Sequence, residues 1–287
     1  MWELASFILK IASYAVVLSA AGGALFLILF PTLNVRERNR VVTMTLGLAL
    51  AGSLLTAMAI PLRSGFLSGM GLSGMFEPFY LNMLFESVVG TSTKLRWLGL
   101  ALIGFVWLRR PLGYGIGALG AVLTVASFAL IGHTADLEAR LAGGGLIALH
   151  LLAVSFWIGA LWPLIWMSYA PDTSRVARVL ERFGTLAMVL VGALILAGGS
   201  VAWLLLDQLS TLWESHYGNL LVFKLLVFIS LLALAGLNRF RLVPRFAEEV
   251  PGASVALRRS IALEVVAVGA ILAITAALTT FASPFES

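Results

Sequence analysis

Residues 143–168 read GGGLIALHLLAVSFWIGALWPLIWMS and contain no aspartate, glutamate, lysine or arginine. A helix rises about 1.5 Å per residue, so a run of this length is sufficient to cross the roughly 30 Å hydrocarbon core of a bilayer. Its one ionisable side chain, His150, lies about two helical turns from the beginning of the run. The stretch therefore predicts a transmembrane helix that carries a single imidazole.

The rest of the chain has a similar composition. Hydrophobic residues make up 60% of it and charged residues 11%, with a mean hydropathy of +1.01, whereas soluble domains are roughly 45–50% apolar and about 25% charged. Eight apolar stretches lie at about residues 5–30, 41–60, 90–108, 113–131, 143–168, 183–206, 219–238 and 259–281. Most are near or above the roughly 20 residues that a spanning helix needs. The sequence predicts an all-α, polytopic membrane protein with eight transmembrane helices in a single integral membrane domain, residues 1–287.

Basic residues concentrate in alternate connections between these stretches. Four such connections hold 13 of the 19 lysines and arginines, namely Arg36, Arg38, Arg40, Arg109, Arg110, Arg175, Arg178, Arg182, Arg239, Arg241, Arg245, Arg258 and Arg259. Lysine and arginine are enriched in cytoplasmic loops, so we expect these connections to be cytoplasmic and both termini to lie on the outer face. The net charge of +5 is then a topological signal. The positive charge favours binding of anionic lipid headgroups, and no nucleic-acid partner is needed to explain it.

The two halves of the chain show a weak internal repeat. The superposed pairs are Tyr14 and His150, Ser19 and Ser155, Gly23 and Gly159, Gly90 and Gly218, and Arg96 and Lys224. Four expected helices separate the copies, so the repeat predicts two parallel four-helix halves, about residues 1–132 and 133–287. Chance matching of small residues in apolar helices is the alternative. Glycines such as Gly22, Gly23, Gly159, Gly198 and Gly199 are typical of close helix packing.

All three histidines lie at or near the outer ends of the expected helices. His133 closes the fourth stretch, His150 lies inside the fifth, and His216 precedes the seventh. An imidazole inside a span costs free energy unless it faces a partner or a wet cavity, so His150 is the first candidate for a metal ligand. The alternative is a structural hydrogen bond for His133 and His150, and an exposed loop position for His216.

Four of the eight methionines are expected on the same face. Met58 ends the second stretch, and Met70, Met75 and Met83 follow it in a glycine-rich connection. Thioether sulfur is a neutral, soft ligand that suits Cu(I), although methionine is also an ordinary filler of apolar gaps. Because the chain has no cysteine, a soft-metal site on an oxidising outer face has to use methionine and histidine.

Three charged residues lie within the expected helices. Arg96 and Lys224 are close enough to the outer surface for their long side chains to reach it. Glu264 lies about two turns from the inner end of the last stretch. We expect Glu264 to pair with Arg239 or Arg182, the alternative being a cation or proton site at an inner exit.

Signatures of soluble-type catalysis are missing from the sequence. It contains no P-loop, no HExxH pair, no GxSxG elbow and no GxGxxG after a strand. Transport or a membrane redox site remains, so we expect no ATP hydrolysis.

The run ALHLLAVSFWIGAL, residues 148–161, resembles the signature helix of the copper resistance protein D (CopD) family. Other pieces with the same resemblance are Gly132-His133, Tyr217-Gly218 with Lys224, NRFRLVP at residues 238–244, and RRSIALE at residues 258–264. The resemblance is strongest from about residue 130 to 281. It implies a bacterial inner-membrane protein of eight helices in copper uptake or handling, with its outer face and both termini periplasmic. It also implies a periplasmic copper carrier of the CopC type, here as a separate chain.

Residues and resemblance together predict a copper transporter, and no enzyme, that receives copper from the periplasm. His150 is the expected buried ligand, His133 the entry ligand and His216 a weaker one, with Met58, Met70, Met75 and Met83 as a capture set for Cu(I). Because Tyr14 takes the place of His150 in the first half, the site is expected to be asymmetric. Trp157 and Trp162 are expected interfacial anchors, or else an aromatic wall.

Two other functions remain open at this point. His133 and His150 on neighbouring helices suit the axial ligation of one haem on the outer side, as in a membrane oxidoreductase. The chain also suits a non-transporting docking or assembly partner of the copper carrier.

Overall fold

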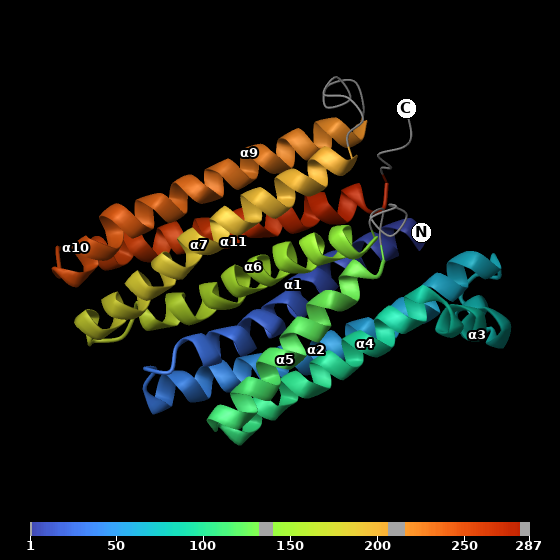
Figure 1. Ribbon diagram of the computed structural model, residues 1–287, viewed down its shortest axis with the longest axis horizontal. Coiled ribbons are helices and arrows are strands. Elements are labelled where there is room, and N and C mark those ends of the chain that lie inside the picture. The colour runs from blue at the N-terminus through green and yellow to red at the C-terminus, as the bar shows by residue number, and fades with distance from the viewer. Residues whose placement is uncertain (1, 132–139, 206–215, 282–287) are drawn as a thin grey trace.

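The computed structural model describes residues 2–131, 140–205 and 216–281, which form helices and turns without a strand. The long helices run between the two ends of one bundle (Figure 1). They are α1 (Trp2–Leu29), α2 (Val35–Ser68), α4 (Val88–Ile103), α5 (Pro111–Ala129), α6 (Arg140–Met167), α7 (Thr173–Leu205), α9 (His216–Leu237) and α11 (Ala253–Leu278). The short elements are the 3-10 helices η1 (Ser73–Phe76) and η2 (Gly104–Leu108), the helices α3 (Pro78–Glu86) and α10 (Val243–Ala247), and the π-helix η4 (Asn238–Leu242).

Six helical segments in the described part of the chain are long and apolar enough to cross a membrane. They are Trp2–Leu29, Val35–Ser68, Pro111–Ala129, Gly144–Met167, Tyr217–Ala247 and Ala253–Leu278. Helix α4 has only 16 residues before it continues into η2, and α7 begins with several charged residues. The predicted all-α membrane architecture is therefore confirmed, while the count of eight spans stays a prediction.

Helix α2 begins at a capping box and continues well past Met58. The Asn34 side chain accepts a hydrogen bond from the backbone N–H of Glu37 at 2.8 Å, and the Glu37 carboxylate accepts one from the Asn34 N–H at 3.2 Å. The helix ends at Gly69, whose φ of +67° is a left-handed conformation that glycine adopts readily. The expectation that Met58 ends this helix is wrong, because α2 accommodates Pro61 and continues to Ser68.

Helix α1 crosses α6 at two glycines. A Cβ atom on Gly22 would lie 1.8 Å from the carbonyl oxygen of Ser155, and one on Gly159 would lie 2.3 Å from the carbonyl carbon of Gly22. A Cβ atom on Gly23 would lie 2.3 Å from Oγ1 of Thr45 on α2. The predicted close helix packing is thus confirmed for these three glycines, and it makes α1 the centre of the bundle.

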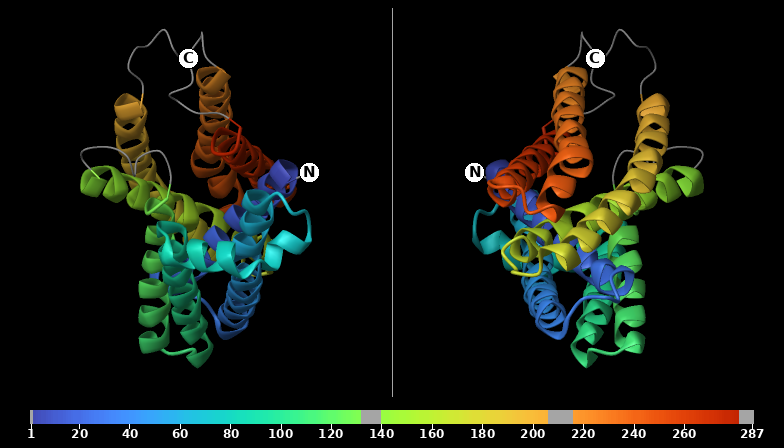
Figure 2. Two further views of the ribbon diagram at one scale, coloured as in Figure 1. Left: turned by 90° about the vertical axis from the view of Figure 1, so that its right-hand side faces the viewer. Right: turned by 90° about the vertical axis from the view of Figure 1, so that its left-hand side faces the viewer.

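The other helices lie on two sides of this centre. Helices α2, α4 and α5 lie on one side of α1 and α6, and α7, α9 and α11 lie on the other (Figure 2). Gly199 of α7 has open space around it, so the expectation of close packing is wrong there. The surroundings of Gly198 lie outside the described residues.

The beginning of α1 and the end of α11 lie at the same end of the bundle. Lys10 Nζ donates hydrogen bonds to the carbonyl oxygen of Thr279 at 2.6 Å and to Oγ1 of Thr280 at 3.0 Å. The short elements η1 and α3 lie at this end too (Figure 1).

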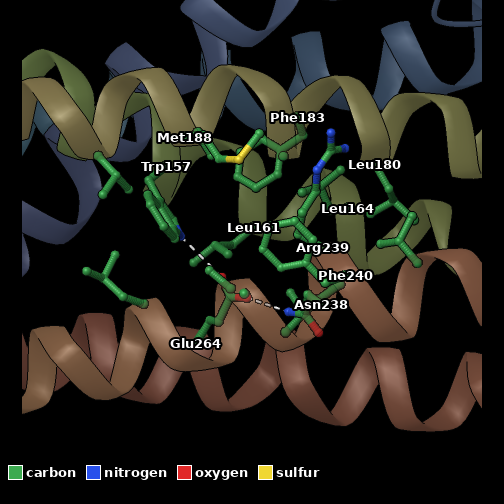
Figure 3. A pocket seen from close by; sticks show the side chains of 18 of the residues that line it. Trp157, Leu161, Leu164, Leu180, Phe183, Met188, Asn238, Arg239, Phe240 and Glu264 are labelled. Carbon is green, nitrogen blue, oxygen red and sulfur yellow. Dashed lines mark hydrogen bonds between the residues drawn. The ribbon is translucent and has the colours of Figure 1, made fainter.

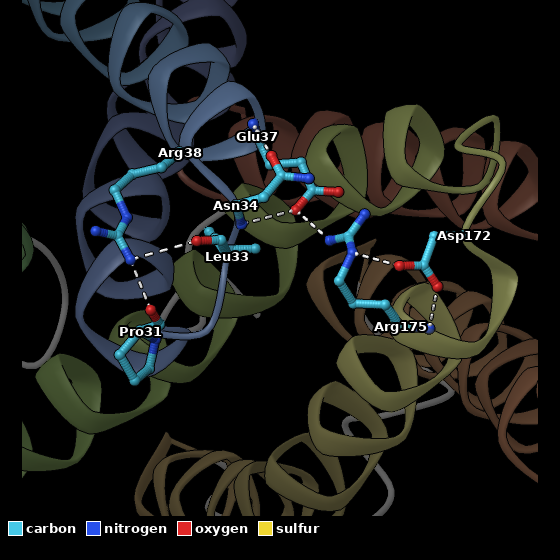
Figure 4. A network of polar contacts seen from close by, with 7 residues as sticks. All are labelled: Pro31, Leu33, Asn34, Glu37, Arg38, Asp172 and Arg175. Carbon is cyan, nitrogen blue, oxygen red and sulfur yellow. Dashed lines mark hydrogen bonds and ion pairs between the residues drawn. The ribbon is translucent and has the colours of Figure 1, made fainter.

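The four basic connections lie at the opposite end (Figure 1), and polar contacts join the α1–α2 and α6–α7 connections there (Figure 4). Arg175 Nη1 lies 2.6 Å from Oε2 of Glu37, which ties the α6–α7 turn to the start of α2. That hydrogen bond raises the pKa of Arg175, and the backbone N–H of Arg175 lowers the pKa of Asp172. Arg109 Nε donates a hydrogen bond to Oδ1 of Asn39 at 3.0 Å, which connects the α4–α5 turn to α2. The assignment of this end to the cytoplasm stays a prediction.

Candidate functional site

His150 lies on α6 at the end of the bundle away from the basic turns. Its side chain is half-buried, and Nδ1 is buried without a hydrogen-bond partner among the described residues. Lys224 of α9 interacts electrostatically with it. An unpartnered imidazole nitrogen can bind a metal ion, but the adjacent ammonium group opposes a cation there.

Of the three histidine side chains, only that of His150 belongs to the described residues. His133 lies outside the described residues. His216 is the first residue of α9 and no longer part of a connection, and its side chain also lies outside the description. The described residues contain no group of three or more histidine, aspartate or glutamate side chains that could hold a metal ion.

The four candidate methionines lie on the first half of the chain. Three of them are exposed: Met58 on α2, Met70 between α2 and η1, and Met83 on α3. Met75 of η1 is half-buried beside Gly65. Elements η1 and α3 pack mainly on α2 and α4, whereas His150 belongs to α6. Three of the four methionines therefore fill no gap in the core. The methionines belong to other elements than His150, the candidate imidazole ligand.

The first half has its own buried cation, Arg96, which the predicted repeat pairs with Lys224. Arg96 is only 9% exposed, and it donates hydrogen bonds to Oγ of Ser127 at 3.0 Å and Oγ of Ser92 at 3.3 Å. Its guanidinium carbon lies 3.8 Å from the centroid of the Phe128 ring, and Tyr14 interacts with it electrostatically. The expected extension of Arg96 to the surface is wrong, because hydroxyl groups and an aromatic face satisfy it inside the bundle.

Tyr14 with Arg96 and His150 with Lys224 are the two pairs that the internal repeat superposes. In each pair the two residues are electrostatic neighbours. The repeat stays a prediction. If it is correct, one half carries a tyrosine and an arginine where the other carries a histidine and a lysine.

A second polar group lies deeper in the bundle, in a cavity of about 260 Å³ between α6, α7, α9 and α11 (Figure 3). Glu264 of α11 lines this cavity and is only 3% exposed. Its Oε2 accepts a hydrogen bond from Nε1 of Trp157 at 3.2 Å, and its Oε1 accepts one from Nδ2 of Asn238 at 2.5 Å. Two neutral donors thus hold the carboxyl group.

The expected ion pair of Glu264 with Arg239 or Arg182 is wrong. Arg239 donates to the carbonyl oxygen of Glu181 at 2.7 Å and to Oγ1 of Thr185 at 3.0 Å, both on α7. The Arg182 guanidinium lies 5.8 Å from the centroid of the Phe30 ring. Both arginines are therefore engaged elsewhere.

Asn238 was included from the sequence only in a stretch of family resemblance, without a role, and Trp157 was misjudged. Trp157 is 4% exposed and lines the cavity, so the expected interfacial anchor is wrong for it, whereas Trp162 is 48% exposed. Asn238 begins the π-helix η4, a local widening that is frequent at functional sites. An amide directly after the apolar run of α9 was the one signal available for it. Met188 of α7 also lines the cavity and was not singled out.

Comparisons with known proteins give two family matches. "Copper resistance protein D" matches residues 177–278, and "Copper resistance protein D-like, N-terminal domain" matches residues 1–143. No solved structure matches the chain.

Three curated relatives are similar to the chain. Copper resistance protein D of Pseudomonas syringae pv. tomato is 30% identical over 258 residues, which are 83% of each chain. Copper transport protein CutJ of Bacillus subtilis (strain 168) is 24% identical over 219 residues, and the match covers 71% of this chain but only 40% of CutJ. Inner membrane protein YebZ of Escherichia coli (strain K12) is 27% identical over 208 residues, 69% of this chain and 70% of YebZ.

Proposed function

Because the chain belongs to the copper resistance protein D family, we propose that it transports copper inward across the bacterial inner membrane. Relatives named for copper transport and copper resistance support copper as the substrate. The absence of soluble-type catalytic motifs from the sequence supports transport over enzymatic catalysis. The observation that carries the proposal is the buried, unpartnered Nδ1 of His150 inside a helix of this family.

The basic turns support a direction for the bundle. In the proposed topology, eight spans cross the membrane and the arginine-rich turns face the cytoplasm. Both termini, η1 and α3 are then periplasmic. Copper arrives at this outer end, where His133, His150, His216 and the exposed methionines are the proposed ligands.

Ligand chemistry and charge both support Cu(I) as the transported ion. Thioether groups prefer soft Cu(I) over harder ions. The ammonium group of Lys224 repels a doubly charged ion twice as strongly as a singly charged one at the same distance. An inward-negative potential supplies only about 2.3 kcal/mol per 100 mV to a monovalent ion. Transport therefore depends on ligands that exchange step by step.

A separate periplasmic carrier of the CopC type is the proposed copper donor. The exposed Met58, Met70 and Met83 are available to receive the ion from such a partner. A thioether surface favours handover of Cu(I) because each methionine is a weak, exchangeable ligand.

The proposal is tested by copper uptake with His150→Ala. We expect the variant to insert normally and to lose at least about tenfold in uptake at limiting copper, equivalent to about 1.4 kcal/mol of binding free energy. The measurement is radioactive copper accumulation in proteoliposomes under reducing conditions. Tyr14→Ala, at the superposed position of the first half, is the matched control and should retain uptake. Parental uptake by His150→Ala would contradict the proposal.

The methionine set is tested by replacing Met58, Met70, Met75 and Met83 with leucine together. Leucine keeps the apolar volume and removes the thioethers, so thermal stability should change little. Uptake from a carrier or chelator that holds Cu(I) should fall several-fold, while Zn(II) binding at the histidines persists. Unchanged Cu(I) uptake by the fourfold variant would mean that these methionines have no part in capture.

A further inference from the structure

The cavity around Glu264 combines groups from all four surrounding helices. Glu264 comes from α11, Trp157 from α6, Met188 from α7 and Asn238 from the end of α9 (Figure 3). Apart from Arg239, the other lining residues carry no ionisable side chain. A carboxyl group, a thioether, an amide and an indole thus line one cavity, separate from the proposed ligands at the outer end.

Glu264 forms no ion pair with a described residue in this cavity, although Arg239 also lines it. An ionised carboxylate that is buried away from water requires a cation or is protonated. Arg239 donates to Glu181 and Thr185 on α7, as described above. Arg258 of α11 donates to the carbonyl oxygen of Ser168. No lysine or arginine among the described residues forms an ion pair with Glu264.

Asn238 suits either protonation state of this carboxyl group. Its Nδ2 donates to Oε1 of Glu264, while its Oδ1 is buried without a hydrogen-bond partner among the described residues. A half-turn of the amide would direct Oδ1 toward Glu264, where it would accept a hydrogen bond from the protonated carboxyl O–H. The same residue therefore stabilises the carboxylate as a donor and the carboxylic acid as an acceptor.

The cavity lies inward from His150 along one face of α6. Trp157 is seven residues after His150, which is about two turns, so the two side chains lie on the same face and about 10 Å apart along the helix axis. The cavity therefore lies between His150 and the basic end of the bundle along α6.

We propose that this cavity is an inner binding site for a monovalent soft cation, and that Glu264 releases its proton when the cation enters. The O–H bond of the carboxyl group breaks, the proton leaves to water, and the cation replaces its charge, so no electron is transferred. The Met188 thioether supplies a polarizable, neutral contact that favours a soft cation over sodium or potassium. This inference rests on the proposed function, in which the cation is Cu(I).

The test uses silver(I), a soft monovalent cation that does not change oxidation state under these conditions. Infrared difference spectra of the purified full-length protein should show a protonated carboxyl C=O band that disappears on addition of silver nitrate. A pH-sensitive dye in weak buffer should record the released proton. Glu264→Gln keeps the shape of the side chain and should lose both signals, while Glu248→Gln, at an exposed carboxylate, should keep both. Persistence of the band in Glu264→Gln, or a band that silver leaves unchanged, would overturn the inference.

A second variant tests the choice of a soft cation. Met188→Leu should keep the protonated carboxyl band and raise the silver concentration that removes half of it by about tenfold. Met167→Leu, at a buried methionine that does not line the cavity, should leave this concentration unchanged. Equal silver dependence in Met188→Leu and the parent would remove Met188 from the site.

The proposed function and the inner cation site can be contradicted separately. If the parent protein does not transport copper but shows the silver-dependent band, the proposed function is wrong and the inner cation site stands. If it transports copper and the band is absent, the inner site is wrong and the proposed function stands.

Discussion

His150 and Glu264 are ionisable residues held inside the bundle, and neither forms an ion pair with a described residue. Each has an unusual neighbour instead. A lysine ammonium group lies beside the imidazole, and two neutral donors hold the carboxyl group. A buried carboxylate without an ion pair costs free energy unless a cation or a proton binds it, whereas Lys224 opposes the binding of a cation or a proton at His150. These two residues are therefore our proposed places for an ion to be held and released.

Replacement of Lys224 tests the role of the ammonium group beside His150. We expect Lys224→Met to tighten binding of silver(I) by roughly tenfold, about 1.4 kcal/mol, because the repulsion is removed while the apolar stem is kept. Isothermal titration of the purified variant against silver measures the change, and Lys224→Arg, which keeps the charge, should bind like the parent. Weaker silver binding by Lys224→Met would mean that the ammonium group positions the imidazole instead of opposing the ion.

At the scale of the helices, the contact between α1 and α6 holds the two sides of the bundle together. At the closest point of this contact the backbones of Gly22 and Gly159 lie against each other with almost no side-chain atoms between them. In a membrane, close approach of backbones replaces much of the hydrophobic driving force of soluble proteins. The register of these two helices should therefore be sensitive to a single methyl group.

Gly22→Ala should destabilise the bundle by roughly 1–3 kcal/mol, because the added Cβ atom cannot avoid the Ser155 carbonyl oxygen without a shift of the helix. The measurement is thermal unfolding in detergent. Gly269→Ala on α11, where nothing lies within 4 Å of the added atom, should be neutral or slightly stabilising. Equal loss of stability in the two variants would show that helix propensity, and not the crossing, determines the effect.

The helices themselves were largely predictable from the sequence, because the length of an apolar run determines a span regardless of its neighbours. Boundaries were less predictable, as α2 shows by continuing past Met58 to Ser68. The contacts of Glu264 were not predictable, since Trp157 and Asn238 reach it from other helices, 107 and 26 residues away in the chain. A single sequence shows which polar residues are costly to bury. It does not show which helix supplies their hydrogen-bond partners.

On the scale of the whole molecule, polarity separates the two ends of the bundle. The arginine-rich turns gather at one end, where Arg175 pairs with Glu37, and the end of α11 meets the beginning of α1 at the other. This asymmetry supports the proposed topology, on which the periplasmic position of all the candidate outer ligands depends.

Cysteine labelling tests that topology directly, because the chain has no native cysteine. Ser73 in η1 and Ser174 near the start of α7 are exposed at opposite ends of the bundle, so a cysteine at either position should be reactive without disturbing the core. With an impermeant maleimide on intact spheroplasts, Ser73→Cys should be labelled and Ser174→Cys should not. Both should be labelled after lysis, which controls for intrinsic reactivity. Labelling of Ser174→Cys alone in intact spheroplasts would place the arginine-rich end outside. His150 would then lie toward the cytoplasm and Glu264 toward the periplasm, and the proposed route of copper would run outward.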